Sequence, residues 1–391
     1  MLQKKILANQ LIDFRHYFHQ HPELANSEFN TTNKIKEILK SWGIKILPSQ
    51  LKTGVFAEIG KKAGPILALR ADIDALPIKE KTGLSYSSKN KGIMHACGHD
   101  IHIVSLLGAS YLLKQKENEL PGRIRLIFQL AEEDKEGALQ VIKDGKLEGV
   151  QAILGFHNRP GILGEIGLRS GIVSGAIDKF KVNLIGTGSH ASAPQKGKDA
   201  IAALGAEINS LQSIISRNLD PFQAAVLSIT HVNAGNTWNI LPEKAFFEGT
   251  VRTANLNVRH LIRQRFLKIV KSIASAYGVK TDISWYKGDP SVNNDEYLTK
   301  VVRDETRKYF KIYRQNSGLG SDDFACFQEK VPGVYANIGN GERVNAHRPD
   351  FKADDKTIIY GTKFFEKNAF RILRELNKTK FNFIKQEKTF G

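Results

Sequence analysis

The stretch ILALRADID, residues 66–74, joins a run of mostly apolar residues directly to two aspartates. Such a run predicts a strand that is buried on both faces, with the acidic residues at its carboxyl end. The same pattern recurs in IRLIFQLAEE, residues 124–133, and in AILGFH, residues 152–157. Because ligands gather beyond the carboxyl ends of parallel strands, these three polar ends predict one shared site.

Helices and strands alternate over the first part of the chain. Apolar residues at helical spacing predict helices over residues 2–20, 28–42, 104–114 and 138–143. Ser27 is the expected cap of the second helix. Extended apolar runs predict strands over residues 55–59, 66–71, 124–129 and 152–156. This alternation is typical of an α/β fold, with a mostly parallel sheet flanked by helices.

The order of elements changes between residues 176 and 289. Here we expect strands over 180–186, 225–232, 245–251 and 280–285, and helices over 200–215 and 258–276. This βαββαβ order is typical of a ferredoxin-like domain. After residue 290 the earlier pattern returns, with a helix over 297–310, a strand over 333–338 and a helix over 356–376.

A chain of 391 residues is also larger than one hydrophobic core usually absorbs. We therefore expect a discontinuous catalytic domain, residues 1–175 and 290–391. An inserted lid or dimerisation domain would occupy residues 176–289.

Composition excludes several classes of protein. With 41% apolar and 25% charged residues, the chain is that of an ordinary globular protein. The formal charge of +17 suggests nucleic-acid binding, but the basic residues are interspersed with acids and lack interleaved aromatic residues, so we expect no such partner. Two distant cysteines predict a reducing, cytoplasmic setting. The sequence contains no run of 18 apolar residues and no cleavage signal. We therefore expect neither a membrane span nor export.

The sequence MHACGHDIH, residues 94–102, places Cys97 one residue from His99. Thiolate and imidazole are the ligands that a borderline metal such as zinc prefers. Taken alone, such a pair is more often a buried thiol beside a structural histidine. Glu133, His157 and His347 lie at separate points of the chain and, together with this pair, predict one metal centre.

Nine segments, in order along the chain, resemble the metal-dependent aminoacylase and carboxypeptidase family. The resemblance is strongest to its amidohydrolase branch, which includes hippurate hydrolase, indoleacetyl-amino-acid hydrolase and N-acetyldiaminopimelate deacetylase. The matching segments are HQHPELANSE (19–28), RADIDALPI (70–78), MHACGHD (94–100), FQLAEE (128–133), GFHNRP (155–160), GTGSHASAP (186–194), NILPE with EGTVR (239–252), GSDDFA (320–325) and AHRPDF (346–351). Two residues depart from the branch: Ile101 replaces a glycine and is expected to narrow the pocket, and Leu130 replaces a proline.

The resemblance implies a site with two divalent cations, zinc or manganese, with cobalt or nickel also open. The implied ligands are Cys97, which would bridge the cations, and His99, Glu133, His157 and His347. Asp74 would orient a ligand through a hydrogen bond, whereas Asp72 is not expected to be a ligand.

Adjacent acids at 132 and 133 need a physical reason, because like charges repel. Metal binding supplies one if Glu133 coordinates and Glu132 takes the proton from a metal-bound water as general base. The alternative is two solvated acids at the start of a helix, where the helix dipole favours negative charge.

Further roles are implied for the inserted domain. His190 would stabilise the oxyanion, often across a homodimer that forms through this domain. Asn239 and Arg252 would hold the substrate carboxylate.

Asp322 and Asp323 are expected to cap the following helix rather than to catalyse.

The function implied by the resemblance is metal-dependent hydrolysis of the amide bond in small N-acyl amino acids. Three alternatives remain at this point. The chain could be a dipeptidase or carboxypeptidase on short peptides, or a hydrolase with Cys97 as nucleophile and His99 as base. It could also be a metal- or peptide-binding dimer without catalysis.

Overall fold

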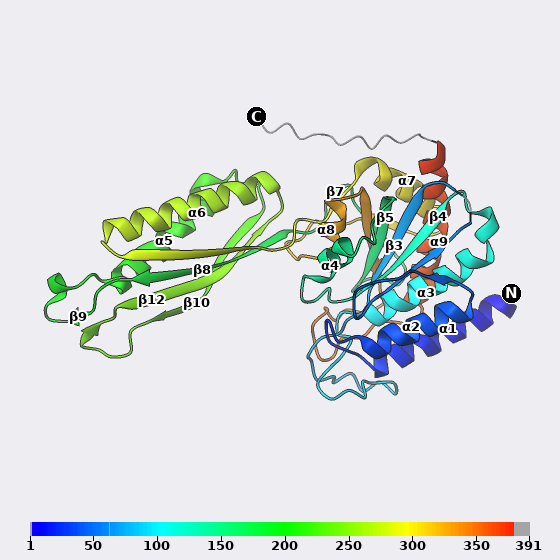
Figure 1. Cartoon of the computed structure of the whole chain (residues 1–391), viewed down its shortest axis with the longest axis horizontal. Coiled ribbons are helices and arrows are strands. Elements are labelled where there is room, and N and C mark those ends of the chain that lie inside the picture. The colour runs from blue at the N-terminus through cyan, green and yellow to red at the C-terminus, as the bar shows by residue number, and fades with distance from the viewer. Residues whose placement is uncertain (1, 62, 379–391) are drawn as a thin grey trace. The chain divides into compact units, whose positions relative to one another are not determined.

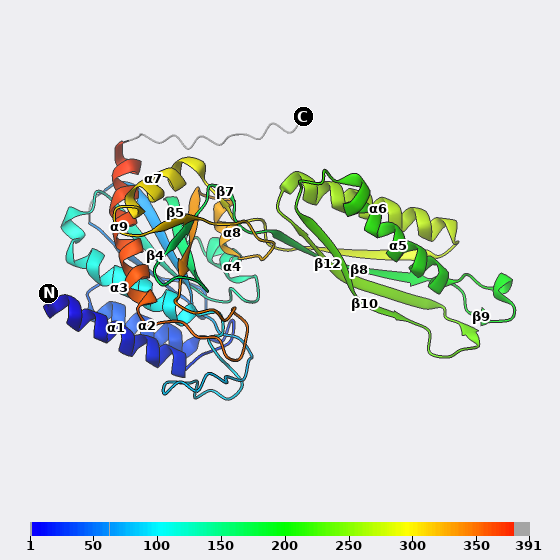
Figure 2. The same cartoon turned by 180° about the vertical axis from the view of Figure 1, so that it is seen from behind.

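The computed structural model describes residues 2–61 and 63–378, and within them the chain forms two compact units. The larger unit takes the described residues up to 171 together with 293–316 and 323–378. The inserted unit takes residues 172–292 and 317–322. Figures 1 and 2 show both from opposite sides. The roles expected for them, catalysis for one and lid or dimerisation for the other, stay predictions.

An eight-stranded sheet forms the centre of the larger unit. Its strands, in spatial order, are β1 (Lys45–Ile46), β2 (Val55–Ile59), β4 (Arg123–Gln129), β3 (Ile66–Asp72), β5 (Val150–Arg159), β16 (Gly333–Gly339), β6 (Ile166–Leu168) and β15 (Ile312–Arg314). The four central strands, β4, β3, β5 and β16, are parallel. Their carboxyl ends therefore share one edge of the sheet.

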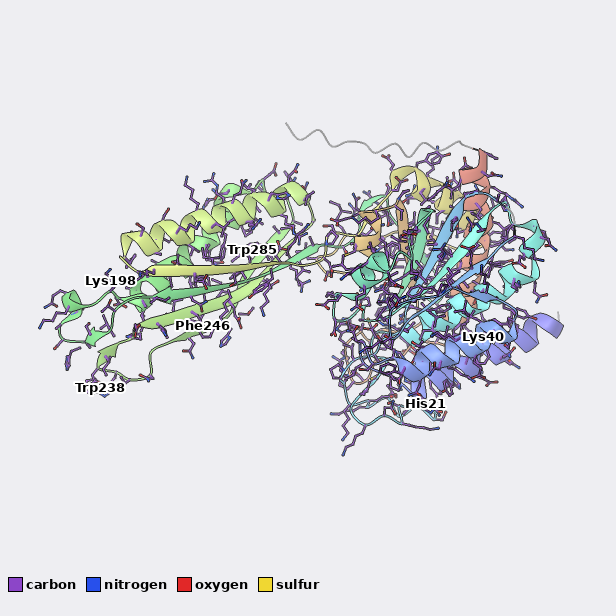
Figure 3. The ribbon with its side chains drawn as sticks, viewed as in Figure 1. His21, Lys40, Lys198, Trp238, Phe246 and Trp285 are labelled. Carbon is purple, nitrogen blue, oxygen red and sulfur yellow. The ribbon has the colours of Figure 1, made fainter. Side chains whose placement is uncertain are left out.

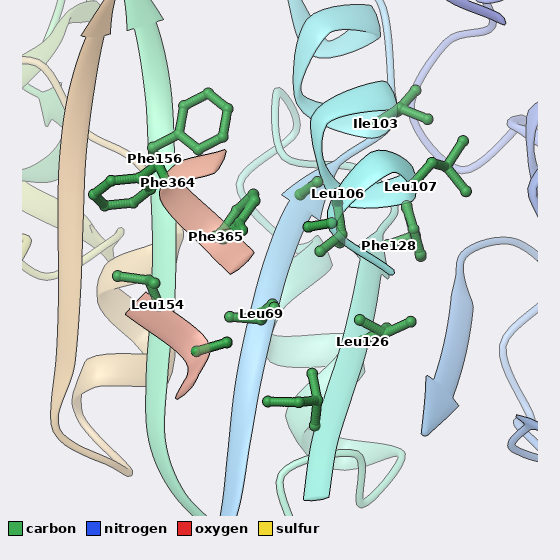
Figure 4. Close-up of a cluster of buried hydrophobic side chains, with 14 of the residues drawn as sticks. Leu69, Ile103, Leu106, Leu107, Leu126, Phe128, Leu154, Phe156, Phe364 and Phe365 are labelled. Atoms are coloured by element: carbon green, nitrogen blue, oxygen red, sulfur yellow. The ribbon is translucent and has the colours of Figure 1, made fainter. Parts of the chain in front are cut away.

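Helices cover both faces of this sheet. On one face α3 (His99–Gln115) and α9 (Thr357–Lys378) pack together, with α1 (Leu2–Gln20), α2 (Phe29–Ser41) and α7 (Glu296–Thr306) beside them. Figure 4 shows side chains of β3, β4 and β5 packed against α3 and α9. Neighbours on a strand point to opposite faces. Thus the Phe156 ring lies 5.1 Å from that of Phe365 on α9, whereas Gly155 faces Phe324 of α8 (Phe324–Gln328), which contacts α4 (Gly137–Lys143).

The α/β class and the expected helices and strands are confirmed, with three local corrections. Ser27 does not cap the second helix, because its N-cap residue is Glu28 and no side chain makes the cap hydrogen bond. The helix predicted from residue 104 begins at His99, since the buried polar residues His99, Asp100 and His102 in its first turn interrupt the apolar pattern. The helix predicted to reach residue 310 ends at Thr306.

None of the helices described within residues 2–61 and 63–378 combines the length and the hydropathy that crossing a bilayer requires.

The inserted unit has a four-stranded antiparallel sheet with helices α5 (Ala200–Asn218) and α6 (Leu256–Ala276) packed on it. Its strand order is β10 (Ala225–Ala234), β12 (Lys244–Thr253), β8 (Ala176–Ile185) and β13 (Lys280–Lys287). Along the chain these elements follow the βαββαβ order. In β12 buried and half-exposed residues alternate, which places the apolar side chains on the face toward the helices.

Glu207 is an ionisable group inside this second core. It lies on α5 and is fully buried, and neither carboxyl oxygen has a hydrogen-bond partner among the described residues. Burial disfavours the charged form and raises the pKa of Glu207 to about 8. The native unit therefore retains a proton over a pH range in which the unfolded chain has lost it.

This buried acid should make the stability of the inserted unit depend on pH. With a native pKa of about 8 against an ordinary 4.5, stability falls as pH rises from about 4.5 to about 8, because the native state binds more protons than the unfolded state. We expect Glu207→Gln to remove this part of the pH dependence. Urea unfolding at pH 5 and pH 8 measures it through the fluorescence of Trp285, which packs on Phe180 and Phe266.

Equal pH slopes for wild type and Glu207→Gln would contradict the prediction. Glu243→Gln, at an exposed position of the same unit, serves as the control and should keep the wild-type loss of stability between the two pH values.

Candidate metal centre

A glycine allows the bend that presents Cys97 and His99. Gly98 has φ +81° and precedes the first turn of α3. A Cβ on Gly98 would lie 2.4 Å from Nδ2 of Asn158, so no other residue fits here without displacing that side chain. The amide of Asn158 also donates to the carbonyl oxygen of Cys97 at 2.9 Å.

The structure brings together all five residues predicted as ligands. Their ligand atoms form overlapping groups, Cys97 with His99 and His157, and Cys97 with Glu133 and His347, in which the atoms lie within 4.8 Å of one another. Cys97 Sγ is 3.3 Å from His157 Nε2, and His347 Nε2 is 3.4 Å from Glu133 Oε1. We call these five residues the metal cluster. Their coordination of metal stays a prediction.

Two buried polar atoms of the metal cluster support a fit to cations. His99 Nε2 has no hydrogen-bond partner among the described residues. Glu133 Oε1 lies 3.9 Å from this atom and 3.4 Å from His347 Nε2. Leaving a buried polar atom unpaired costs free energy, and a cation between these atoms would satisfy them. Hydrogen bonds first to Cys97 and then to Glu133 raise the pKa of His347 to about 10. The site therefore favours positive charge. The donor set of one thiol, one carboxylate and three imidazoles suits a borderline divalent metal.

Backbone acceptors fix which nitrogen of two imidazoles faces the cluster. Nδ1 of His99 donates to the carbonyl oxygen of Asp74 at 2.9 Å, and Nδ1 of His157 donates to that of Asn158 at 2.5 Å. In both rings Nε2 is then left with its lone pair toward the cluster. The side chain of Asp74 also accepts from the backbone N–H of Glu133 at 2.9 Å. Asp74 thus contacts two residues of the metal cluster.

His102 ends the same motif, residues 94–102, but the sequence pattern assigned it no role. Its Nδ1 lies 2.6 Å from Asp72 Oδ1, and its Nε2 accepts from the backbone N–H of Asn158 at 2.9 Å. Asp72 also binds Arg70 at 2.7 Å. Burial would raise the pKa of Asp72, but His99 and Arg70 hold it well below its usual range. The spacing of His99 and His102, which places both on one helix face, is the signal that could have revealed this contact.

The loop that carries Glu132 and Glu133 is held tightly. Ala131 has φ +50°, an uncommon value for a residue other than glycine. Its N–H donates to Oε1 of the fully buried Glu28 at 2.8 Å. At the other end a Cβ on Gly137 would lie 1.8 Å from the carbonyl oxygen of Leu130.

This packing decides between the two interpretations of the acid pair. Glu132 is only 5% exposed and is bound by Lys135 at 3.0 Å. Its carboxylate also lies within 4.8 Å of ligand atoms of His99 and Glu133. The alternative of two solvated acids at a helix start is therefore wrong.

The expectation for Asp323 is also corrected. Asp323 precedes α8 but makes no side-chain cap hydrogen bond there. Its carboxylate instead binds Arg70 at 2.8 Å and Gln129 at 2.7 Å, and accepts from the N–H of Ala138 in the first turn of α4 at 2.9 Å. The residue therefore caps a different helix and neutralises a buried guanidinium, which its position in the sequence does not reveal.

A pocket of about 560 Å³ opens beside His347 in the larger unit. Most of its lining is polar, including Asn158, Arg159 and Asn337. Ile101, expected to narrow the pocket, is instead fully buried in the hydrophobic core and is not part of this lining.

Three predicted site residues lie in the inserted unit and are placed within it alone. His190 is on β9 (Ser189–His190), which pairs with β11 (Ile240–Leu241) directly after Asn239. The N–H of Ser192 donates to Nδ1 of His190, so the proton of the neutral ring is on Nε2. Trp238, on the same loop, is 92% exposed (Figure 3). Arg252 lies near the opposite end of β12, where it binds Ser321 at 3.3 Å.

Glu28 gives a test of how the acid loop is held. Glu28→Ala removes the acceptor for the N–H of Ala131, so we expect the loop that carries Glu133 to loosen. Metal affinity should then fall about 10- to 100-fold, the usual effect of losing a residue that orients a ligand. Glu28→Gln keeps an acceptor oxygen and should stay within about threefold of wild type. Competition with a chelator measures the affinity, with the exposed Glu37→Ala as control. Equal losses for the alanine and glutamine variants would show that the hydrogen bond is not the cause.

Comparisons with known proteins agree with this geometry. The model of the peptidase family M20/M25/M40 matches residues 68–371. The chain is 45% identical to N-acetyl-L-cysteine deacetylase of Bacillus subtilis (strain 168), covering 96% of this chain and 91% of that one. It is 35% identical to hippurate hydrolase of Campylobacter jejuni, covering 94% and 98%. The crystal structure of the Bacillus subtilis YXEP protein, a dinuclear metal binding peptidase, superposes with a TM-score of 0.86 at 38% identity, covering 95% and 99%.

Proposed function

Since the chain belongs to the peptidase family M20/M25/M40 and is a metal-dependent amidohydrolase, we propose that it releases the amino acid from small N-acetylated amino acids. The observation that carries the proposal is the metal cluster, whose two groups share Cys97, with the buried Glu132 beside it. Two relatives that are 45% and 41% identical are deacetylases of N-acetylcysteine. The polar lining of the pocket beside His347 suits a short acyl group better than a long apolar one.

In this proposal the metal cluster would hold two divalent cations, with Cys97 belonging to both groups of ligand atoms. A thiolate favours zinc, while the carboxylate and three imidazoles also suit manganese, cobalt or nickel. Bound there, the cations polarise the amide carbonyl and lower the pKa of the attacking water.

Glu132 moves the proton in this proposal. Its carboxylate accepts a proton from the water that adds to the amide carbon, and passes it to the nitrogen as the C–N bond breaks. The products are a carboxylate and a free amino acid. The Lys135 ammonium lies 3.0 Å from the carboxylate of Glu132 and places a positive charge beside the proton acceptor.

The inserted unit supplies the remaining contacts. Nε2–H of His190 donates to the oxyanion that forms at the carbonyl oxygen. Asn239 and Arg252 bind the carboxylate of the amino acid, for which a planar guanidinium is well suited. Because they lie near opposite ends of β12, they act from different subunits, Asn239 together with His190. We propose a homodimer formed through this unit, with His190 acting on the partner's site.

One alternative substrate class has support of its own. A relative from Saccharolobus solfataricus that is 37% identical is named thermostable carboxypeptidase 1. This name supports short peptides as an alternative substrate class for this chain. A purely binding role is excluded, because the chain is an enzyme of a hydrolase family. Cys97 as a nucleophile with His99 as base fits poorly, since it gives no role to Glu133, His157 and His347, whose ligand atoms lie within 4.8 Å of Cys97 Sγ.

A substrate panel tests the proposal directly. The metal-loaded chain should release free amino acid from N-acetyl amino acids faster than from N-benzoyl amino acids or dipeptides, as measured by a primary-amine assay. Removal of the cations should abolish turnover, and returning them should restore it. If the cation-free chain and the reloaded chain were both inactive on all three substrate classes, the proposal would be refuted. A preference for dipeptides would favour the peptidase alternative.

Glu132→Gln separates water activation from nucleophilic catalysis. Without a proton acceptor, we expect kcat to fall about 10²- to 10⁴-fold while the bound metal stays at its wild-type amount. Elemental analysis of the purified variant gives the metal content. If Cys97 were the nucleophile, the glutamine variant would keep most of its activity and a Cys97 acyl intermediate would be trapped by mass spectrometry.

A further inference from the structure

A second pocket of the larger unit, of about 630 Å³, is lined by four arginines. It lies at the edge of the sheet where α7 contacts β6. Arg169 follows β6, Arg314 ends β15, and Arg303 and Arg307 come from the carboxyl end of α7. We call this the arginine pocket.

Strand pairing explains why these side chains converge. β15 runs parallel to β6, and Arg314 pairs with Leu168 while Ile312 pairs with Ile166. Paired residues point to the same face of a sheet, so Arg314 shares a face with Leu168 and Ile312, which also line the pocket. Arg303 and Arg307 are four residues apart on a helix and therefore lie on one side of it.

The positive charge of the pocket is not balanced by acidic side chains. The guanidinium groups of Arg169, Arg303 and Arg314 form no ion pair within the part of the chain that the structure describes. Arg307 has a distant contact to Asp304, at 3.7 Å. Cations gathered in this way repel one another unless an anion joins them.

The arginine pocket adjoins the pocket beside His347 at edge strand β15. Tyr313 lines both pockets, whereas Ile312 and Arg314 line only the arginine pocket and Gln315 lines only the pocket beside His347. The residues that line the arginine pocket include none of the metal cluster. Its four arginines therefore lie outside the metal cluster.

We propose that the arginine pocket binds a small phosphorylated organic molecule. Guanidinium groups bind the oxygens of a phosphate in pairs, which ammonium groups cannot do. Leu168 and Ile312 provide apolar surface for the organic part. The volume is in the usual range of small-molecule sites, roughly 300–1,000 Å³.

Calorimetric titration of the full metal-loaded chain with phenylphosphonate, which resists hydrolysis, tests the proposal. Each arginine that binds the phosphonate should contribute about tenfold or more in affinity. Arg303→Ala with Arg314→Ala should therefore weaken binding about 100-fold. The lysine double variant keeps the charge and should lose less. Inorganic phosphate should bind at least tenfold more weakly than phenylphosphonate, and equal affinities would overturn the organic part of the proposal.

Two controls make the result specific. Arg371→Ala with Arg374→Ala removes the same charge from α9 and should leave binding within about threefold of wild type. Cys97→Ala, which disrupts the metal cluster, should also retain binding. The proposal is overturned if the wild type does not bind, or if the Arg303 and Arg314 double variant binds normally. It is also overturned if either control loses affinity as the Arg303 and Arg314 double variant does, since binding would then reflect the overall charge or the metals.

Discussion

The hydrogen bonds of Asn158 hold the metal cluster together. From the end of β5, its side-chain amide reaches the carbonyl of Cys97 and its backbone N–H reaches His102, while its side-chain oxygen accepts from Asn340 beyond β16. One residue thus joins two strand ends to the first turn of α3. Because the ligands come from separate segments of chain, their relative positions depend on such bonds between segments.

Much of this arrangement could be predicted from the sequence. Buried parallel strands have near-continuous apolar runs, and polar residues directly after them mark the shared edge. Of the five predicted ligands, Glu133 and His157 stand near the ends of such strands, whereas Cys97, His99 and His347 were included through the resemblance of their motifs to a known family. Short edge strands such as β15 could not be predicted, because three residues are too few to show the alternation of apolar and polar residues that marks a strand. Asp323 and Glu28 also escaped, since their partners are distant in sequence and are set only by tertiary packing.

Buried ionisable groups are accommodated in two ways in this chain. In the larger unit Arg70 is enclosed by Asp72, Asp323 and Gln129, so its charge is neutralised in a dry environment. Such a network resists the removal of any member, because each leaves a charge without its counterpart. Glu207 in the inserted unit has no such partners among the described residues and is accommodated by holding its proton.

The contact between Gly98 and Asn158 also restricts how this centre can diverge. A side chain at 98 would occupy the space of the amide at 158, and a smaller residue at 158 would give up the bonds that hold the cysteine loop. A replacement at one of these positions alone disrupts the packing or the hydrogen bonds of the cysteine loop. A change in sequence here therefore requires replacements at both positions. Homologous chains should therefore vary at these two sites together or not at all.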